Sequence, residues 1–265
     1  MRVTMLGTGT SHGVPMLDCL LNNYARCPHM VCLKARSEAR YRRTRASILV
    51  EAGGSSILVD TSQDFYQQML ANTVRRIDAV VYTHGHADHI YGLADIRSYC
   101  RHQEGAIPIY GSAETLECIR GAFDYVFTPP DFVGGGIPSV ETHVLDRPTA
   151  VAGGVVTPVP VEHGPLNGCL GLRIGATAYI PDVKRIPEAS MALLQDLDLL
   201  ILNCLRLRPH GSHLTLDDSL QYVKLLRPRR TLLTHLSHDI DEDVEGWLLP
   251  SGVAFARDGL VVDCV

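Results

Sequence analysis

Short runs of apolar, mostly β-branched residues recur along the chain and alternate with segments of mixed polarity. Such runs, bounded by polar, glycine or proline residues, predict buried strands. The expected strands are 2–6, 47–51, 57–60, 79–82, 107–110, 139–145, 155–162, 170–174, 178–180, 197–203 and 231–234. The segments 64–74, 91–100 and 114–127 predict helices, the first with Asp64 in a capping position. Residues 128–136, rich in proline and glycine, predict a loop at the rim of a cleft.

Length and composition allow one large domain or two small ones. The chain has 265 residues, and a hydrophobic content of 46% can bury a sizeable core. The net charge of −5 and the pI of about 6.2 give no global basic field that would attract nucleic acid or a membrane surface. The sequence shows neither a signal peptide nor an apolar run near the ~18 residues of a membrane span. The eight cysteines are scattered, so we expect a cytoplasmic location with reduced thiols.

The densest chemistry follows the apolar run 79–82. His84, His86, Asp88 and His89 lie within six residues, and imidazole and carboxylate groups are ligands that Zn, Mn and Fe prefer. His84 and His86 leave the strand end with one residue between them, so both can point the same way. Asp88 and His89 lie on the next turn and can face a second position nearby. The spacing therefore predicts a divalent metal site, because a structural role for one lone histidine does not explain four ligand residues together.

This segment resembles the first metal motif of the metallo-β-lactamase superfamily. The resemblance implies a single domain over residues 1–265, with an α/β fold that is a four-layer αββα sandwich carrying a metal site at one edge. It also implies three further ligands at strand ends, and the sequence offers His163, Asp182 and His235 in that order. Asp60 matches a family carboxylate that supports the metal loops from behind the ligands.

The resemblance also divides the seven ligands between two metal positions. One would be formed by His84, His86 and His163, the other by Asp88, His89 and His235, with Asp182 between them. Two divalent ions, Zn or Mn and alternatively Fe, would lie ~3.5–4 Å apart and hold a bridging hydroxide. That hydroxide would attack phosphorus in line with the leaving alkoxide, and Asp88 is expected to be a catalytic residue as well as a ligand.

Two further elements resemble ribonuclease Z and its phosphodiesterase relatives. The glycine-rich turn 7–15 has no dinucleotide or P-loop fingerprint and matches a loop that borders the metal cleft in that group. His12 in this turn is therefore a candidate substrate contact, with a structural role as the alternative. His213 and Thr215 match the family's His-x-Thr element, whose histidine acts on the leaving group. We expect His213, as the imidazolium, to protonate the leaving alkoxide or stabilise its charge.

The basic run 41–45 precedes a strand. Such runs are usually solvated, but Arg43 and Arg45 are candidate phosphate contacts.

Three cysteines predict a separate structural metal. Cys19, Cys27 and Cys32 lie within fourteen residues, which favours a metal over a disulfide in a cytoplasmic protein. With the glycine-rich turn and the basic run, this loop resembles the phosphoribosyl cyclic phosphodiesterases of the carbon–phosphorus lyase pathway. In that family a histidine three positions past the last catalytic ligand completes a structural zinc site, which implies His238 here. Seven residues separate Cys19 from Cys27, a wider spacing than in the family, so Cys27 is the least supported ligand.

The sequence thus predicts a dinuclear metal-dependent phosphodiesterase acting on a small, cyclic, nucleotide- or sugar-like phosphodiester. A tRNA 3′-processing nuclease is the nearest alternative, disfavoured because no glycine- and lysine-rich arm is present to bind tRNA phosphates. A thioester or lactone hydrolase could use the same metal core, but a thiolate leaves without the proton that His213 would supply. A non-catalytic binding protein would be expected to have lost ligands. A small phosphodiester is the expected partner, membranes and tRNA are not, and a homodimer stays open.

Overall fold

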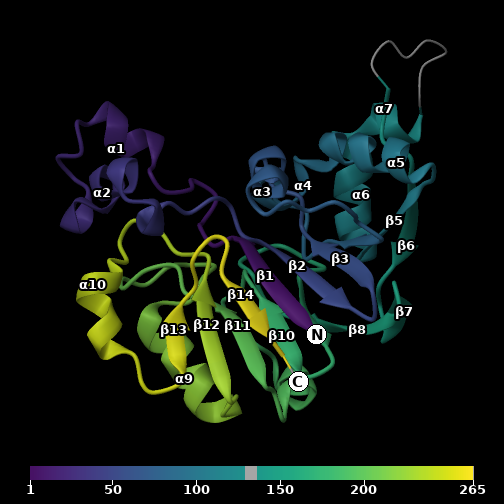
Figure 1. Cartoon of the computed structure of the whole chain (residues 1–265). Coiled ribbons are helices and arrows are strands. Elements are labelled where there is room, and N and C mark those ends of the chain that lie inside the picture. Colours follow the sequence, from purple (N-terminus) through teal and green to yellow (C-terminus); the bar gives the residue numbers. More distant parts are fainter. Residues whose placement is uncertain (129–135, 265) are drawn as a thin grey trace.

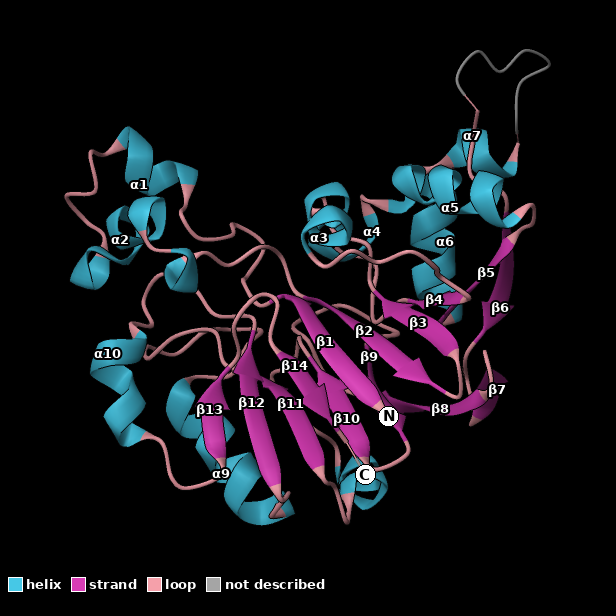
Figure 2. Cartoon of the chain, in the orientation of Figure 1, coloured by secondary structure: helices cyan, strands magenta, loops and turns pink. Residues whose placement is uncertain are grey.

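Two seven-stranded β-sheets lie face to face at the centre of the molecule, with helices on their outer sides (Figures 1 and 2). The computed structural model describes residues 1–128 and 136–264. The order of the first sheet is β14-β1-β2-β3-β4-β5-β6, and that of the second is β13-β12-β11-β10-β9-β8-β7. The α/β sandwich expected from the sequence is confirmed.

The first sheet contains β1 (Arg2–Gly7), β2 (Ser47–Ala52), β3 (Ser55–Val59), β4 (Ala79–Val81), β5 (Ile107–Gly111), β6 (Val140–Val144) and β14 (Val261–Asp263). The second contains β7 (Thr149–Val151), β8 (Gly154–Pro160), β9 (Leu170–Ile174), β10 (Thr177–Ile180), β11 (Leu199–Asn203), β12 (Arg230–Thr234) and β13 (Val253–Phe255). The α-helices are α1 (Leu17–Leu21), α2 (Val31–Ser37), α3 (Phe65–Ala71), α4 (Ala87–Ile90), α5 (Arg97–Gln103), α6 (Ala113–Ala122), α7 (Asp124–Phe127), α8 (Glu188–Met191), α9 (Leu216–Leu226) and α10 (Glu242–Glu245). Short 3-10 helices occur at Pro28–Met30, Ala39–Tyr41, Leu93–Ile96, Ala192–Leu194 and Gly246–Leu248.

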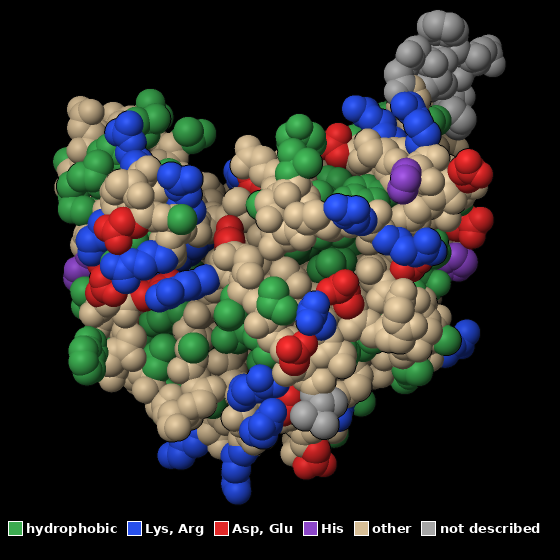
Figure 3. Space-filling view, in the orientation of Figure 1, with side chains coloured by type: hydrophobic (Ala, Val, Ile, Leu, Met, Phe, Trp, Pro, Cys, Tyr) green, Lys and Arg blue, Asp and Glu red, His purple; other side chains and the backbone are tan. Residues whose placement is uncertain are grey.

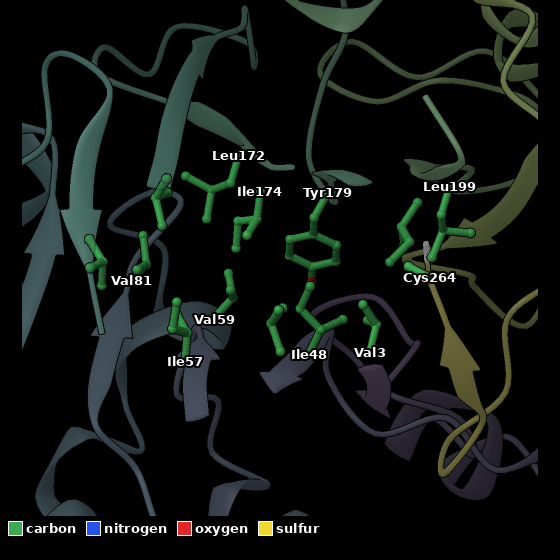
Figure 4. Close-up of a cluster of buried hydrophobic side chains, with 14 of the residues drawn as sticks. Val3, Ile48, Ile57, Val59, Val81, Leu172, Ile174, Tyr179, Leu199 and Cys264 are labelled. Carbon is green, nitrogen blue, oxygen red and sulfur yellow. The ribbon is translucent and has the colours of Figure 1, made fainter. Parts of the chain in front are cut away.

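The central core lies between the two sheets, and Figure 4 shows part of it. Val3, Ile48 and Val59 from the first sheet meet Leu172 and Tyr179 from the second. Burying a side chain of this size contributes about 1.5–3 kcal/mol relative to leaving it in water. The contact between the inner faces is therefore what holds the two sheets together.

The strands beside the metal motif are buried on both faces. In β11, Leu199 and Ile201 face the central core, while Leu200 and Leu202 belong to a second apolar cluster that includes Leu216 of α9. Successive strand residues point to opposite faces, so a strand covered on both sides needs apolar residues at every position. This explains why the sequence shows continuous apolar runs here instead of strict alternation.

The parallel arrangement of strands gathers the chemistry at one edge. Strands β3 to β6 pair in parallel in the first sheet, as do β10 to β13 in the second. Parallel strands end at the same edge, where the following loops meet. His84 follows β4, Asp182 follows β10 and His235 follows β12, so the packing of the sheets brings these loops together.

Several elements differ from the sequence expectation. Segment 91–100 is a 3-10 turn followed by α5, and segment 114–127 is divided into α6 and α7 at Phe123. Asp64 is the first residue before α3 but makes no capping bond, because its carboxylate accepts hydrogen bonds from Arg45 instead. The strands β7, β13 and β14 are not predicted, because three residues each are too few to show a pattern of apolar positions.

Two remaining expectations concern loops and membranes. Of the loop expected at 128–136, residues 129–135 lie outside the described part of the chain. Among the described residues, we find no helix long and apolar enough to cross a membrane.

Candidate metal centre and substrate pocket

The loop after β4 delivers four potential ligands to the sheet edge. His84 is fully buried at the strand end, and His86 immediately precedes α4, which carries Asp88 and His89 in its first turn. His84 Nε2 lies 3.0 Å from His86 Nδ1, and His163 Nε2 lies 3.3 Å from the same atom. Nitrogen ligands about 2.0–2.1 Å from a tetrahedral metal would lie about 3.3 Å from one another. These three histidines therefore have the spacing of a metal site.

A second group of ligands surrounds Asp182. His89 Nε2 lies 3.2 Å from Asp182 Oδ2 and 3.4 Å from Asp88 Oδ2. His235 Nε2 lies 3.2 Å from Asp182 Oδ1 and 3.7 Å from Asp88 Oδ2. His163 Nε2 reaches the same Asp182 oxygen at 3.8 Å. Asp182 thus lies between both groups, and all seven residues expected from the sequence converge.

The unpaired polar atoms of this cluster fit divalent metal ions. His89 Nε2, Asp182 Oδ2 and both ring nitrogens of His235 are buried without a hydrogen-bond partner. Buried polar atoms are nearly always satisfied in folded proteins, so such a concentration of exceptions needs a partner. Imidazole nitrogens and carboxylate oxygens are suitable ligands for Zn, Mn or Fe. The nitrogen and oxygen atoms of this cluster therefore fit Zn, Mn or Fe as ligands.

Burial and neighbouring charges set the protonation states of the ligands. Burial alone would raise the pKa of Asp182, but the neighbouring His235 and His89 hold it well below its usual value. Burial likewise opposes ionisation of Asp88, yet His89 and His235 lower its pKa. Burial lowers the pKa of His84, whereas for His89 burial is outweighed by the carboxylates Asp88 and Asp182, which raise the pKa. A metal would therefore bind the ionised carboxylates and His84 directly and would displace a proton from His89.

Hydrogen bonds behind the ligands fix which ring nitrogen faces the site. Asp60 accepts from Thr83 Oγ1 at 2.9 Å, so the Thr83 oxygen is free to accept from His84 Nδ1 at 3.0 Å. Asp60 also accepts from His89 Nδ1 at 2.7 Å, and the carbonyl of Ser212 accepts from His163 Nδ1 at 2.8 Å. Each Nδ1 therefore carries the proton, which leaves the lone pair on Nε2 for a metal.

His213 lies beside the ligand cluster with a defined tautomer. The Asn203 side chain accepts from the Leu214 N–H at 2.9 Å, and its amide nitrogen donates to the Pro181 carbonyl at 2.6 Å, which fixes the orientation of the amide. The same amide nitrogen lies 3.2 Å from His213 Nδ1, so Nδ1 accepts a hydrogen bond. The proton of the neutral ring is therefore on Nε2.

The imidazolium expected for His213 does not agree with this geometry. A protonated Nδ1 would place two donors, its own and that of Asn203, against each other. Burial also lowers the pKa of His213 to about 2, with a further contribution from nearby His235. His213 is thus a neutral donor in this structure, and the sequence could not show this because the contact with Asn203 is tertiary.

A pocket of about 220 Å³ adjoins the metal cluster through His213. Its lining comes from three separate segments: Thr10, Ser11, His12 and Met16; Leu205, Arg206, His210 and His213; and Ser237, His238 and Asp239. His12 thus lies where the sequence expected a substrate contact. The sequence reasoning missed Arg206 and His210. The repeated histidine in His210-x2-His213 was the available signal, and their ring centroids lie 5.0 Å apart.

The two arginine candidates lie elsewhere and need correction. Arg43 is almost completely buried, and its guanidinium donates to the carbonyls of Ser237 at 2.6 Å and Ile240 at 3.0 Å. Arg45 pairs with Asp64 at 2.9 Å. Neither lines the pocket, because both guanidinium groups are used to hold protein segments together.

The three cysteines and His238 form a separate cluster. His238 Nδ1 lies 3.0 Å from Cys19 Sγ, 3.6 Å from Cys32 Sγ and 3.8 Å from Cys27 Sγ. Sulfur and nitrogen ligands of a tetrahedral zinc ion would lie about 3.5 Å apart. Backbone N–H groups of Met16 and Cys32 donate to Cys32 Sγ and Cys27 Sγ, at 3.3 and 3.2 Å. The bond from Met16 favours the Cys32 thiolate, but burial outweighs it and raises the pKa of Cys32 and of Cys19. Thiols become thiolates when they bind zinc, and the spacing and type of the four groups fit such an ion.

Comparison with known proteins agrees with the fold and the site. Residues 55–236 match the family model of the beta-lactamase superfamily domain. With its two-sheet sandwich and ligand cluster, the chain belongs to the metallo-β-lactamase superfamily and is a hydrolase of that class.

Within this class the chain is similar to a crystal structure of a diphosphatase from the PhnP family, with 38% identity and a TM-score of 0.88, over 100% of this chain and 98% of the other. The Zn²⁺-bound PqqB of Methylobacterium extorquens covers 100% of both chains with a TM-score of 0.81. Its 21% identity supports the fold alone.

A curated relative from Porphyromonas gingivalis, an octanoyltransferase, is 36% identical over 266 residues, which is 98% of this chain. The present chain spans only 51% of that protein, about half its length. The name describes the longer protein, so its activity does not transfer to the matched half.

Proposed function

We propose that this chain hydrolyses a small phosphodiester, with a cyclic nucleotide- or sugar-like ester as the preferred form, using two divalent metal ions. The observation that carries the proposal is the position of His213, which lines the pocket with Nε2 as its donor beside seven converging metal ligands. The similarity to a PhnP-family diphosphatase supports cleavage of a phosphorus–oxygen bond.

The ligands have distinct roles in this proposal. His84, His86 and His163 would hold one ion, and Asp88, His89 and His235 the other, with Asp182 shared. Bound there, divalent ions supply Lewis acidity that polarises phosphoryl oxygens and makes a bound water more acidic. Six of the seven ligands are buried, which keeps them rigid, while His86 is exposed and leaves the centre open to solvent on its side.

His213 would act on the leaving group as a neutral donor. The Asn203 amide holds His213 Nδ1 as an acceptor, so the Nε2–H is available to the departing oxygen. A ribose alkoxide is strongly basic and gains much from such a donor, while a thiolate gains little. This distinction favours an oxygen ester over a thioester.

A pyrophosphate diester is the second candidate. It is supported by the diphosphatase named among the similar structures. Its leaving group is a phosphate, which is far less basic than an alkoxide, so the donor from His213 would matter less. Hydrolysis of a phosphodiester should therefore depend on His213 more strongly than hydrolysis of a pyrophosphate diester.

A substrate panel tests the proposal. The metal-loaded protein is assayed with bis(p-nitrophenyl) phosphate, cyclic ribose phosphates, a dinucleoside pyrophosphate, an octanoyl thioester and precursor tRNA. We expect the small phosphodiesters to react fastest, and tRNA to react little because the chain has a net charge of −5. Preferential cleavage of the thioester, or of tRNA in a salt-sensitive manner, would contradict the proposal.

A further inference from the structure

The cysteine cluster and the substrate pocket share a wall. His238 faces the three sulfurs through Nδ1 and also lines the pocket that contains His213. Met16 lines the same pocket, and its backbone N–H donates to Cys32 Sγ at 3.3 Å. One pocket residue, His238, is therefore a member of the cluster Cys19, Cys27, Cys32 and His238, and a second, Met16, is hydrogen-bonded to it.

The part of the segment that carries Cys19 and Cys27 has only a small apolar core, whereas its later part is also held to α10 by the pairs Lys34–Asp241 and Arg40–Asp243. Its apolar cluster contains Val14, Cys19, Tyr24, Cys27, Val31, Cys32, Ala35 and Tyr41, so the three cysteines are a large part of it. In α1 only Cys19 is buried, while Leu17 and Leu21 are 75% and 78% exposed. Figure 3 shows apolar side chains on the surface of this lobe at the upper left. A core this small usually needs a metal or a disulfide to stay folded.

A short segment of the chain, residues 235–238, links the cysteine cluster to the metal centre. His235, a ligand in the cleft, lies three residues before His238 and has a positive φ of 60°, which is strained for a residue with a side chain. The following Leu236 donates to the Thr8 carbonyl at 2.8 Å and accepts from the Thr10 N–H at 3.3 Å. The turn that carries Thr10 and His12 is therefore bonded to the same short segment that the cluster anchors at its other end.

We propose that the cysteine cluster, when it holds zinc, positions the substrate pocket. It fixes the wall formed by residues 10–16 and 237–239, so its loss lowers substrate affinity more than the rate of the chemical step. The kinetic part of this inference rests on the phosphodiesterase activity proposed above. The structural part, ordering of the pocket wall by zinc, does not.

The kinetic test uses Cys19→Ser, which removes a ligand near the surface, and Cys100→Ser as the matched control. Cys100 is a buried thiol outside both sites, and its Sγ donates to the Ser139 carbonyl, a bond that a hydroxyl can also make. Cys19→Ser should lose about one zinc per chain and keep the cleft metals. We expect KM for the best small phosphodiester to rise about tenfold or more, with kcat within about threefold of wild type. The control should match wild type in both.

The structural test needs no substrate. Amide hydrogen exchange is compared in wild type with and without cluster zinc, which is removed by reversible thiol modification and restored after reduction. This measurement also serves if Cys19→Ser does not fold. Exchange should increase at 10–16 and 237–239 and stay unchanged at 97–111, and zinc should reverse the change.

Each outcome bears on a defined claim. Loss of zinc with unchanged KM, or with unchanged exchange in the pocket wall, overturns the positioning role. A fall in kcat together with loss of the cleft metals overturns it as well, because the cluster would then support the whole metal centre. If wild type cleaves no phosphodiester but the exchange response is present, the proposed function fails and the positioning role stands.

Discussion

At the scale of single residues, neighbouring hydrogen bonds decide what each histidine can do. His84, His89 and His163 donate through Nδ1 and present Nε2 as a lone pair, whereas His213 accepts at Nδ1 and presents Nε2–H. The same side chain type thus provides metal ligands in the cluster and, in His213, a hydrogen-bond donor between the cluster and the pocket. Asp60 and Asn203, neither of which needs to touch a substrate, establish this difference.

Replacing His213 with Ala should slow alkyl phosphodiesters far more than nitrophenyl ones. An alkoxide leaving group gains much from a proton donor, while p-nitrophenolate is already stable. General acid catalysis supplies 10²–10⁴-fold, and the loss on alkyl esters should be roughly in that range. The measurement is the ratio of the two rate losses at full metal occupancy.

His210→Ala is the matched control for this comparison, because His210 lines the same pocket 5.0 Å from the His213 ring. We expect it to affect both substrates equally. Equal losses on both substrates in the His213 variant would mean that His213 positions the phosphate and does not donate to the leaving oxygen.

Asp258 should make stability depend on pH in an unusual direction. Burial raises the pKa of its carboxyl to about 6, although Thr44 and Thr8 donate hydrogen bonds to it. A folded-state pKa above the unfolded value of 3.8 means that its contribution is fully present below pH 3.8 and is lost as the pH rises through about 6. Relative to Asp258→Asn, wild type should lose up to about 3 kcal/mol across this window.

The measurement is urea unfolding of both proteins in chelator at several pH values between 4 and 7, so that metal affinity does not contribute. The difference in unfolding free energy isolates Asp258, since all other groups are common to both. A difference that stays constant with pH would show that the carboxyl ionises as easily in the folded protein as in water.

At the scale of elements, helix α6, which packs on the first sheet, contacts the loop that carries His84 and His86. A Cβ added to Gly85, between His84 and His86, would lie 2.7 Å from Cys118 Cβ and 2.8 Å from its Sγ in α6. Contacts this short require one of the two elements to move. The glycine in the motif is therefore explained by packing against α6.

Gly85→Ala should displace the ligand loop and weaken metal binding. A displacement near 1 Å at a reacting centre typically costs on the order of 10² in rate, and we expect a loss of that size in kcat. Metal titration and rate measurement on the same preparation give the result. Adding Cys118→Gly should restore much of the activity, with about 1 kcal/mol lost in stability for glycine within a helix. If Cys118→Gly does not help Gly85→Ala, the defect lies in the loop itself.

At the scale of the whole molecule, the metal centre connects the two sheets. The ligands His84, His86, Asp88 and His89 follow a strand of the first sheet, while His163, Asp182 and His235 follow strands of the second. Bound ions would therefore add bonds between halves of the molecule that otherwise meet through their apolar inner faces. Metal binding should then act on global stability as well as on activity.

Removing the metals with a chelator should lower Tm substantially. A ligand present at about 1,000 times its Kd stabilises by about 4 kcal/mol, and each kcal/mol shifts Tm by roughly 2–4 °C at this size. We expect a fall of roughly 10 °C, reversed by adding metal back. Asp182→Asn, which removes the shared ligand, should have a low Tm that chelator barely changes. An unchanged Tm in metal-free wild type would show that the ions do not connect the sheets.

The sequence alone indicated the four clustered ligands of residues 84–89, because they come just after an apolar run that predicts a buried strand, while the family resemblance pointed to His163, Asp182 and His235. His84, Asp182 and His235 all lie at the end of such a run, and these runs predicted the strands, whereas the resemblance implied the sandwich. These signals are local, since a strand and its next residues are adjacent in the chain. The cysteine cluster could be inferred only with the help of family resemblance, because Cys19 and His238 are 219 positions apart.

Only the tertiary structure decided how the remaining polar residues are used. Arg43 is adjacent in sequence to other basic residues and reads as a phosphate contact, yet folding buries it against the carbonyls of Ser237 and Ile240. The neutral form of His213 depends on Asn203, ten positions away on another element. Side-chain hydrogen bonds between distant segments form only when the sheets pack, and no pattern along the chain encodes which donor will meet which acceptor.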